Sequence, residues 1–239
     1  MNFPWLTTSR GPSIASSTTT LDSFAGLTAW YKTPISGATD SVNINPWYDS
    51  KGSYNLSGAD YGPTYSTSET INGFSTAKII YNNYNYLPNG GPSSSTLPVT
   101  IVAVMLHTGT HGSGYGDYIL GCNGGNGIIL GLTHPQGYLY SDKFQQANIG
   151  TGNVAVTTNS WHVVMGVITS SIWAFWIDGV PAGNGTHSQT FSGSPTFSLG
   201  QYFNGSIFNG NLVEMGIFNA DRSSDATAIY NSLRSKYAL

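Results

Sequence analysis

Short runs of apolar and aromatic residues, each followed by a cluster of Gly, Asn, Asp, Ser or Pro, recur between residues 21 and 218. Runs of this length are typical of β-strands, and the clusters between them are typical of turns. Only 8% of the residues are charged and 30 are glycine, which disfavours solvent-exposed helices. The strand-like runs are LTAWYKT (27–33), TAKIIYN (76–82), VTIVAVML (99–106), YILGC (118–122), GIILGL (127–132), SWHVVMGVI (160–168), SIWAFWI (171–177), PTFSLGQ (195–201) and LVEMGIF (212–218). The pattern predicts an all-β sandwich or barrel.

A β-hairpin is predicted at WAFWIDGVPAG, residues 173–183. Successive side chains of a strand point to opposite faces, so the bulky residues before the turn divide between two surfaces. Asp178-Gly179 supplies the positive φ angles that a two-residue hairpin turn requires. We interpret Asp178 as a turn-forming residue, with a contact to a ligand as the alternative.

The apolar period changes from strand to helix in the last segment, SSDATAIYNSLRSKYAL (223–239). Ser223 or Ser224 is suited to cap a helix N-terminus, and Arg234 and Lys236 lie in what would be its last turn. The residues that recur at helical spacing are Ala226, Ile229, Tyr230, Leu233 and Tyr237. One short amphipathic helix is therefore predicted after the last strand.

Residues 1–20 are rich in Ser and Thr and are predicted to form an extended arm, followed by one domain over residues 21–239. Phe3, Trp5 and Leu6 form the apolar cluster of this arm. The cluster could dock onto a partner assembly or pack back onto its own domain. The segment has neither the basic region nor the apolar run of a secretion signal, and nowhere do about 18 apolar residues follow one another. We therefore expect neither a Sec signal nor a membrane span.

The formal net charge is −3 and the eight basic residues are scattered, which argues against binding to nucleic acid or to an anionic membrane. Cys122 is the single cysteine, so it cannot form an internal disulfide. No Lys or Arg adjoins it to lower its pKa, and we expect a buried, unreactive thiol.

The closing segment LVEMGIFNADRSSDATAIYNSLRSKY resembles that of LamG-like jelly-roll domains in the concanavalin A-like lectin/glucanase superfamily. Three further stretches resemble the family in the same order: LTAWYKT, PTYSTSETINGFSTAKI (63–79) with its Asn72-Gly73, and SWHVVMGV followed by FWIDGVPAG. The matching positions of the closing segment are Glu214, Asp221, Asp225, Leu233, Lys236 and Tyr237. The resemblance implies a two-sheet antiparallel jelly-roll sandwich. It also implies that glycan binding is common among relatives, with calcium in some and glycosidase activity in others.

The glucanases of this superfamily carry a Glu-x-Asp-x-x-Glu strand, which places two carboxylates on one sheet face. This chain has only Glu69 and Glu214, and neither has that spacing. We therefore expect no enzymatic activity, although pairs of Asp from distant loops stay open as an alternative. Glu214 lies among apolar residues and is interpreted as a structural acceptor held by backbone groups or by Arg222.

Metal ligands are sparse in the sequence. His107 and His111 are four residues apart, a spacing that converges on zinc only in a helix, and the surrounding glycines indicate a loop. His162 follows Trp161 within a strand-like run and is assigned to packing. Calcium prefers several oxygen ligands, and the weak candidates are Asp117, Asn123, Asn126 and Asp142, with turn formation as the alternative. No other cofactor is indicated.

Glycan sites combine an aromatic platform with amide and carboxylate groups, because a sugar ring has an apolar face and hydroxyl edges. Two stretches have that chemistry, YNNYNYLPNGG and QYFNGSIFNGN, with core packing as the alternative for their aromatic residues. The candidate ligand-binding residues are Tyr81, Asn83, Tyr84, Tyr86, Tyr202 and Asn204.

These observations favour a non-enzymatic virion surface protein, such as a phage capsid decoration or fibre-type subunit, that binds glycans and is anchored to the assembly through its arm. The alternative is an exported bacterial carbohydrate-binding or adhesin module, and a glycoside hydrolase or lyase is the third hypothesis. Self-association into a homo-oligomer is compatible with each of them.

Overall fold

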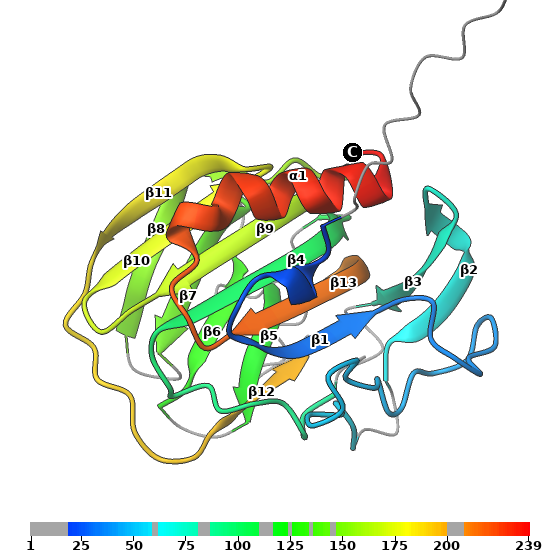
Figure 1. The fold of residues 1–239 in the computed structure, drawn as a ribbon, viewed down its shortest axis with the longest axis horizontal. Coiled ribbons are helices and arrows are strands. Elements are labelled where there is room, and N and C mark those ends of the chain that lie inside the picture. Colours follow the sequence, from blue (N-terminus) through cyan, green and yellow to red (C-terminus); the bar gives the residue numbers. More distant parts are fainter. Residues whose placement is uncertain are drawn as a thin grey trace, which may run out of the picture.

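The computed structural model describes residues 19–58, 62–80, 87–109, 117–123, 126–133, 136–143, 147–199 and 208–239. The predicted docking residues Phe3, Trp5 and Leu6 lie outside them. Two antiparallel sheets pack face to face, and one helix lies on the outer face of the larger sheet (Figure 1). The predicted all-β jelly-roll sandwich with a C-terminal helix is confirmed.

Within the described ranges, the larger sheet has eight strands. In spatial order they are β11 (Val180–Thr186), β10 (Ile172–Ile177), β9 (Trp161–Ile168), β4 (Val99–His107), β13 (Gly210–Phe218), β3 (Phe74–Ile79) and β2 (Thr64–Ile71), with β1 (Leu27–Lys32) also paired to β13. The smaller sheet contains β12 (Thr196–Leu199), β5 (Asp117–Asn123), β6 (Ile128–Leu132), β7 (Tyr138–Lys143) and β8 (Ala147–Ala155). Each of the nine predicted runs overlaps one of these strands. The strand-like runs omit β2, β7, β8 and β11, and β2 and β8 are edge strands rich in Ser, Thr, Gly and Asn.

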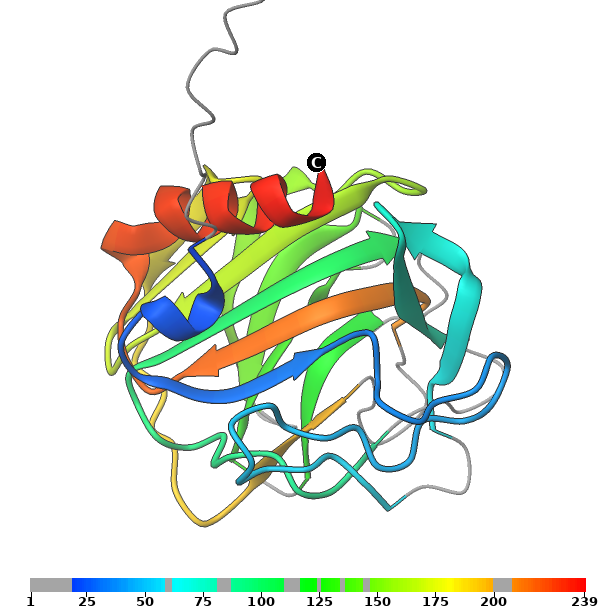
Figure 2. The same cartoon turned by 45° about the vertical axis from the view of Figure 1, so that its right-hand side comes forward.

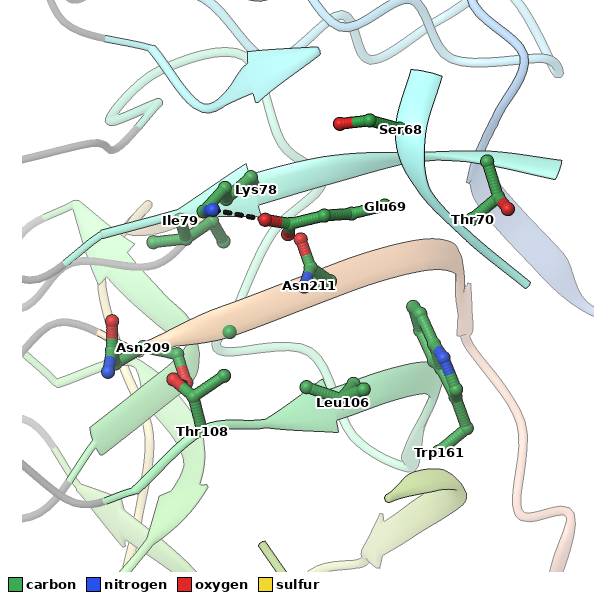
Figure 3. A pocket seen from close by; sticks show the side chains of 11 residues that line it. Ser68, Glu69, Thr70, Lys78, Ile79, Leu106, Thr108, Trp161, Asn209 and Asn211 are labelled. Atoms are coloured by element: carbon green, nitrogen blue, oxygen red, sulfur yellow. Dashed lines mark hydrogen bonds and ion pairs between the residues drawn. The ribbon is translucent and has the colours of Figure 1, made fainter. Parts of the chain in front are cut away.

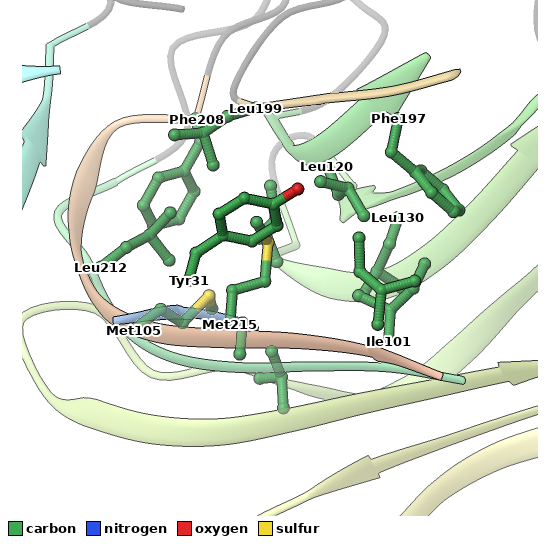
Figure 4. Close-up of a cluster of buried hydrophobic side chains, with 14 of the residues drawn as sticks. Tyr31, Ile101, Met105, Leu120, Leu130, Phe197, Leu199, Phe208, Leu212 and Met215 are labelled. Atoms are coloured by element: carbon green, nitrogen blue, oxygen red, sulfur yellow. The ribbon is translucent and has the colours of Figure 1, made fainter. Parts of the chain in front are cut away.

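The main core lies between the two sheets, where apolar side chains from facing strands interdigitate (Figure 4). Each strand contributes alternate residues because neighbouring side chains point to opposite faces. The side chains labelled in Figure 4 are Tyr31, Ile101, Met105, Leu120, Leu130, Phe197, Leu199, Phe208, Leu212 and Met215. Burial of this cluster is the main force that holds the sheets together.

The β10–β11 hairpin turns at Asp178 (φ 52°) and Gly179 (φ 74°), which confirms the predicted turn. Asp178 also binds the neighbouring strand: its Oδ1 accepts the Val163 backbone N–H at 2.9 Å, and its Oδ2 lies 2.7 Å from His162 Nδ1. A Cβ atom on Gly179 would lie 2.8 Å from Cδ1 of Tyr230. Glycine therefore serves both the turn and the close approach of the hairpin to the helix.

Helix α1 (Ala226–Tyr237) lies across the outer face of the larger sheet (Figures 1 and 2). Its buried residues belong to a second apolar cluster that includes Val102, Val104 and Val163 of the strands beneath. The predicted serine cap is wrong. A 3-10 turn, η3 (Ser223–Asp225), precedes the helix, and Asp225 occupies the cap position without a capping side-chain bond. No helix in the described part of the chain is long and apolar enough to cross a membrane.

Glu214 links helix α1 to the larger sheet through hydrogen bonds. Its side chain is 1% exposed and accepts hydrogen bonds from Trp30 Nε1 (2.6 Å), Lys236 Nζ (2.6 Å) and Tyr237 OH (2.5 Å). Burial and the adjacent carboxylate raise the pKa of the Tyr237 phenol. Glu214 is a buried structural acceptor, as predicted, but the predicted partners are wrong: three side chains hold it instead of backbone groups or Arg222. The Arg222 side chain binds Asp225 at 3.0 Å.

Candidate ligand-binding groove

A groove of about 430 Å³ opens on the outer face of the larger sheet (Figure 3). Its volume lies within the range of small-molecule sites. The groove is lined by Ser68, Glu69 and Thr70 of β2, Lys78 and Ile79 of β3, Leu106 and Thr108 at the end of β4, Trp161 of β9, and Asn209, Gly210 and Asn211 at the start of β13.

The groove continues the outward-facing rows of residues that α1 covers. Val104 on β4 and Val163 on β9 share the apolar cluster beneath the helix. Leu106 and Trp161 are two residues further along the same strands, so they face the same side. The helix has only twelve residues, about 18 Å, and does not cover this end of the sheet.

The β2–β3 hairpin forms one wall of the groove. It turns at Asn72 (φ 46°) and Gly73 (φ 79°), and the Asn72 side-chain amide donates to the carbonyl oxygen of Lys236 at 3.1 Å. Phe74 packs edge-on against Tyr237, with the ring centroids 5.0 Å apart. The helix end therefore supports the wall from behind.

Glu69 and Lys78 form an ion pair on this wall (Figure 3). The Glu69 side chain is 39% exposed and the Lys78 side chain 37% exposed, so both charged groups face solvent. The Thr76 hydroxyl lies 2.8 Å from the carbonyl oxygen of Glu69 and 3.2 Å from Oδ1 of Asn211. These contacts orient the largely buried Asn211 amide on the groove floor, beside the ion pair.

Trp161 forms the wall across the groove from Glu69 and Lys78 (Figure 3). Its ring is partly exposed, and within the described part of the chain its indole N–H has no hydrogen-bond partner. Thr108 donates its hydroxyl to the carbonyl oxygen of Asn209 at 3.0 Å near the other end. The groove thus offers an aromatic face, an unused indole donor, an amide and a pair of opposite charges. This set can bind a polar, uncharged ligand that has one apolar face.

The candidate calcium ligands do not form one cluster. Asp117 and Asn123 are the two ends of β5, about 20 Å apart in an extended strand, and cannot bind the same ion. Asp117 is fully buried, with Oδ2 3.1 Å from His107 Nε2. Asn123 donates to the Asn89 side chain at 2.7 Å, and Asn126 has a φ of 69°, as a turn residue does. Among the described residues, no group of three or more His, Cys, Asp or Glu could hold a metal ion.

Asp142 lies on β7, opposite Ile129 of β6. Burial raises the pKa of its carboxyl group to about 6. Burial also raises the pKa of the Cys122 thiol to about 12, and the prediction of a buried cysteine is confirmed.

The candidate glycan residues lie outside the described residues, as does His111. They are Tyr81, Asn83, Tyr84, Tyr86, Tyr202 and Asn204.

The groove residues were not predicted as a site from the sequence. Trp161 was assigned only to a strand, and its position at a strand end beyond the helix depends on the length of α1. Glu69 and Lys78 could not be paired by counting from the Asn72-Gly73 turn, because a register shift interrupts the β2–β3 ladder between Ser66 and Ile71. In the sequence, only the alternation of side chains along the strand-like run indicated that Trp161 points away from the core between the sheets.

A match to a family model defines the class of protein. The model of the concanavalin A-like lectin/glucanases superfamily matches residues 92–227, more than half of the chain. The chain belongs to this superfamily, and the resemblance inferred from the sequence motifs is confirmed. A comparison with curated protein sequences gives no match.

Several solved structures share the fold. Domain 4 of AbnA, a GH43 extracellular arabinanase from Geobacillus stearothermophilus solved with arabinotriose, aligns with a TM-score of 0.60 and 18% identity, over 85% of this chain and 98% of that domain. The binding domain of Paraclostridial Mosquitocidal Protein 1 aligns with a TM-score of 0.60 and 14% identity, over 87% of this chain and 52% of that one. Trypanosoma rangeli sialidase in complex with sialic acid aligns with a TM-score of 0.54 and 14% identity, over 89% of this chain. The chain spans 33% of the sialidase, and at these identities the likeness shows the fold alone.

Proposed function

We propose that this protein is a non-enzymatic, lectin-like domain that binds glycans in the groove beside Trp161. The observation that carries the proposal is the pairing of an accessible indole face with hydrogen-bonding groups on the facing wall. A sugar ring can stack its apolar face on the indole while its hydroxyls bond with Glu69, Lys78 and Asn211. The arabinotriose complex of a domain with the same fold supports the choice of ligand class.

The single carboxylate among the described lining residues of the groove supports a binding role over hydrolysis. Glycosidases use two carboxyl groups about 5 to 9.5 Å apart, one of them as an acid. Among the described lining residues Glu69 is the single carboxylate, and its partner is an ammonium group. The other glutamate, Glu214, is buried beneath the helix and engaged by three donors.

The placement of this domain on a virion or another surface assembly is also part of the proposal. It is supported by the Ser/Thr-rich arm with its apolar cluster at Phe3, Trp5 and Leu6. Mass spectrometry of purified virions should detect the chain, and deletion of residues 1–12 should abolish its incorporation into them. Incorporation without those residues would contradict anchoring by the arm. The alternative is an exported carbohydrate-binding module, which would use the same groove.

Glycan binding is tested with the full chain on an array of neutral and acidic glycans, followed by calorimetry with the best ligand. Trp161→Ala should weaken binding at least tenfold, because it removes the stacking face. The matched control is Tyr48→Ala, since Tyr48 is a 58% exposed aromatic residue outside the groove lining. A folded Trp161→Ala variant with unchanged affinity would contradict the proposal. Repeating the array with EDTA tests whether calcium contributes.

A further inference from the structure

Two opposite charges meet in the groove, and they are the only charged side chains among its described lining residues. Both side chains are more than one third exposed, so a ligand in the groove can reach them. An exposed ion pair contributes little to folding stability. The two side chains can therefore bind a ligand at little cost to folding stability.

The pair has hydrogen-bonding capacity left after its own contact. The Lys78 ammonium has three N–H donors, and Glu69 Oε1 takes one of them. Glu69 Oε2 has no hydrogen-bond partner within the described part of the chain. A hydroxyl can donate to this oxygen while a neighbouring hydroxyl accepts from the ammonium. Two adjacent hydroxyls of one sugar ring match this arrangement.

The same pair disfavours a charged ligand. An anionic group that approached Lys78 would also meet the Glu69 carboxylate, and like charges at short range repel. Displacing Glu69 from Lys78 would leave the carboxylate without its counter-charge. A cationic ligand meets the converse problem at Lys78.

Building on the proposed function, we propose that the Glu69–Lys78 pair determines the charge class of the ligand. The groove selects uncharged sugars that carry adjacent hydroxyls and rejects uronic and sialic acids. Trp161 supplies stacking to either class, so the discrimination comes from the facing wall.

The test uses Glu69→Gln, which removes one charge and keeps the shape of the side chain. The matched control is Asp22→Asn, which makes the same change in net charge at an exposed residue outside the groove. The probes are a neutral galactan oligosaccharide and an oligogalacturonate of equal length, with the array for the remaining classes. Thermal melting of each variant verifies folding.

The wild-type protein should bind the neutral probe at least tenfold more tightly than the oligogalacturonate. Glu69→Gln should reduce or reverse this ratio, because it exposes an uncompensated ammonium, and Asp22→Asn should leave the ratio unchanged. If Glu69→Gln keeps the wild-type ratio while Trp161→Ala still abolishes binding, the charge-selection proposal fails and the groove remains the binding site. If the folded wild-type protein binds no glycan, or Trp161→Ala has no effect, the proposed function fails as well.

Discussion

Glu214 provides the strongest single test of how this fold is held together. Substitution by alanine removes the acceptor of three hydrogen bonds. Lys236 is partly exposed and can turn to water, but the Trp30 indole N–H and the Tyr237 hydroxyl are buried. Each buried donor left unsatisfied costs about 1 to 3 kcal/mol, and the cavity adds to this. We expect Glu214→Ala to lower the free energy of unfolding by about 3 to 5 kcal/mol.

The loss can be measured by denaturant and thermal unfolding followed by circular dichroism. For a domain of this size, 1 kcal/mol corresponds to about 2 to 4 °C, so the melting temperature should fall by roughly 6 to 20 °C. Glu214→Gln keeps one acceptor oxygen and should lose about half as much free energy. The matched control is Glu69→Gln at the other glutamate, whose exposed ion pair should change stability by less than about 1 kcal/mol.

Two results would refute this reasoning. One is a loss below about 1 kcal/mol in Glu214→Ala, which would mean that the buried hydrogen bonds of Glu214 contribute no more to stability than a surface ion pair. The other is an equal loss in Glu69→Gln, which would mean that burial of the carboxylate is not the cause. Both variants should keep a native-like spectrum below their transitions.

Three further predictions concern other parts of the fold. Gly179→Val should lower the melting temperature by several degrees, because Gly179 has a φ of 74° and a Cβ there would contact Tyr230; an unchanged melting temperature would contradict this. Asp142 has a pKa raised from 3.8 to about 6, so between these values the folded state keeps a proton that the unfolded state has lost, and stability should fall as pH rises through that window. Asp142→Asn should flatten that part of the pH profile and stabilise the protein at pH 7.5 by about 1 to 3 kcal/mol, whereas a profile identical to wild type would exclude the buried carboxyl as its source. Cys122, with a thiol pKa of about 12, should react with a thiol reagent at pH 8 only at the rate of unfolding; rapid labelling of the native protein would show that it is accessible.

Local sequence patterns predicted the fold well because their causes are local. The alternation in Ile172–Ile177 and the Asp178-Gly179 turn depend on strand pleat and backbone φ, which neighbouring residues determine. The helical spacing of Ile229 and Leu233 likewise identified a helix before any partner was known. The helix start was predicted less well, since η3 and the Arg222–Asp225 contact replace the expected serine cap.

The hydrogen-bond partners of Glu214 could not be predicted from the residues near it in sequence. Arg222 is near Glu214 in sequence and was the charge expected to hold it. The packing of α1 instead brings Lys236 and Tyr237 onto the carboxylate and leaves Arg222 beside Asp225. Which charges meet depends on the position of the helix across the sheet, which no single segment specifies.

The sequence by itself determined the all-β class, the hairpin, the closing helix and the superfamily, because strand alternation, turn chemistry and motif order are properties of short segments. Only the tertiary structure decided the groove. Its lining includes Glu69, Lys78, Trp161 and Asn211, which span more than 140 residues of the chain. They meet because antiparallel pairing through β13 brings β3 and β4 to either side of it, and because a helix of twelve residues is too short to cover the strand ends.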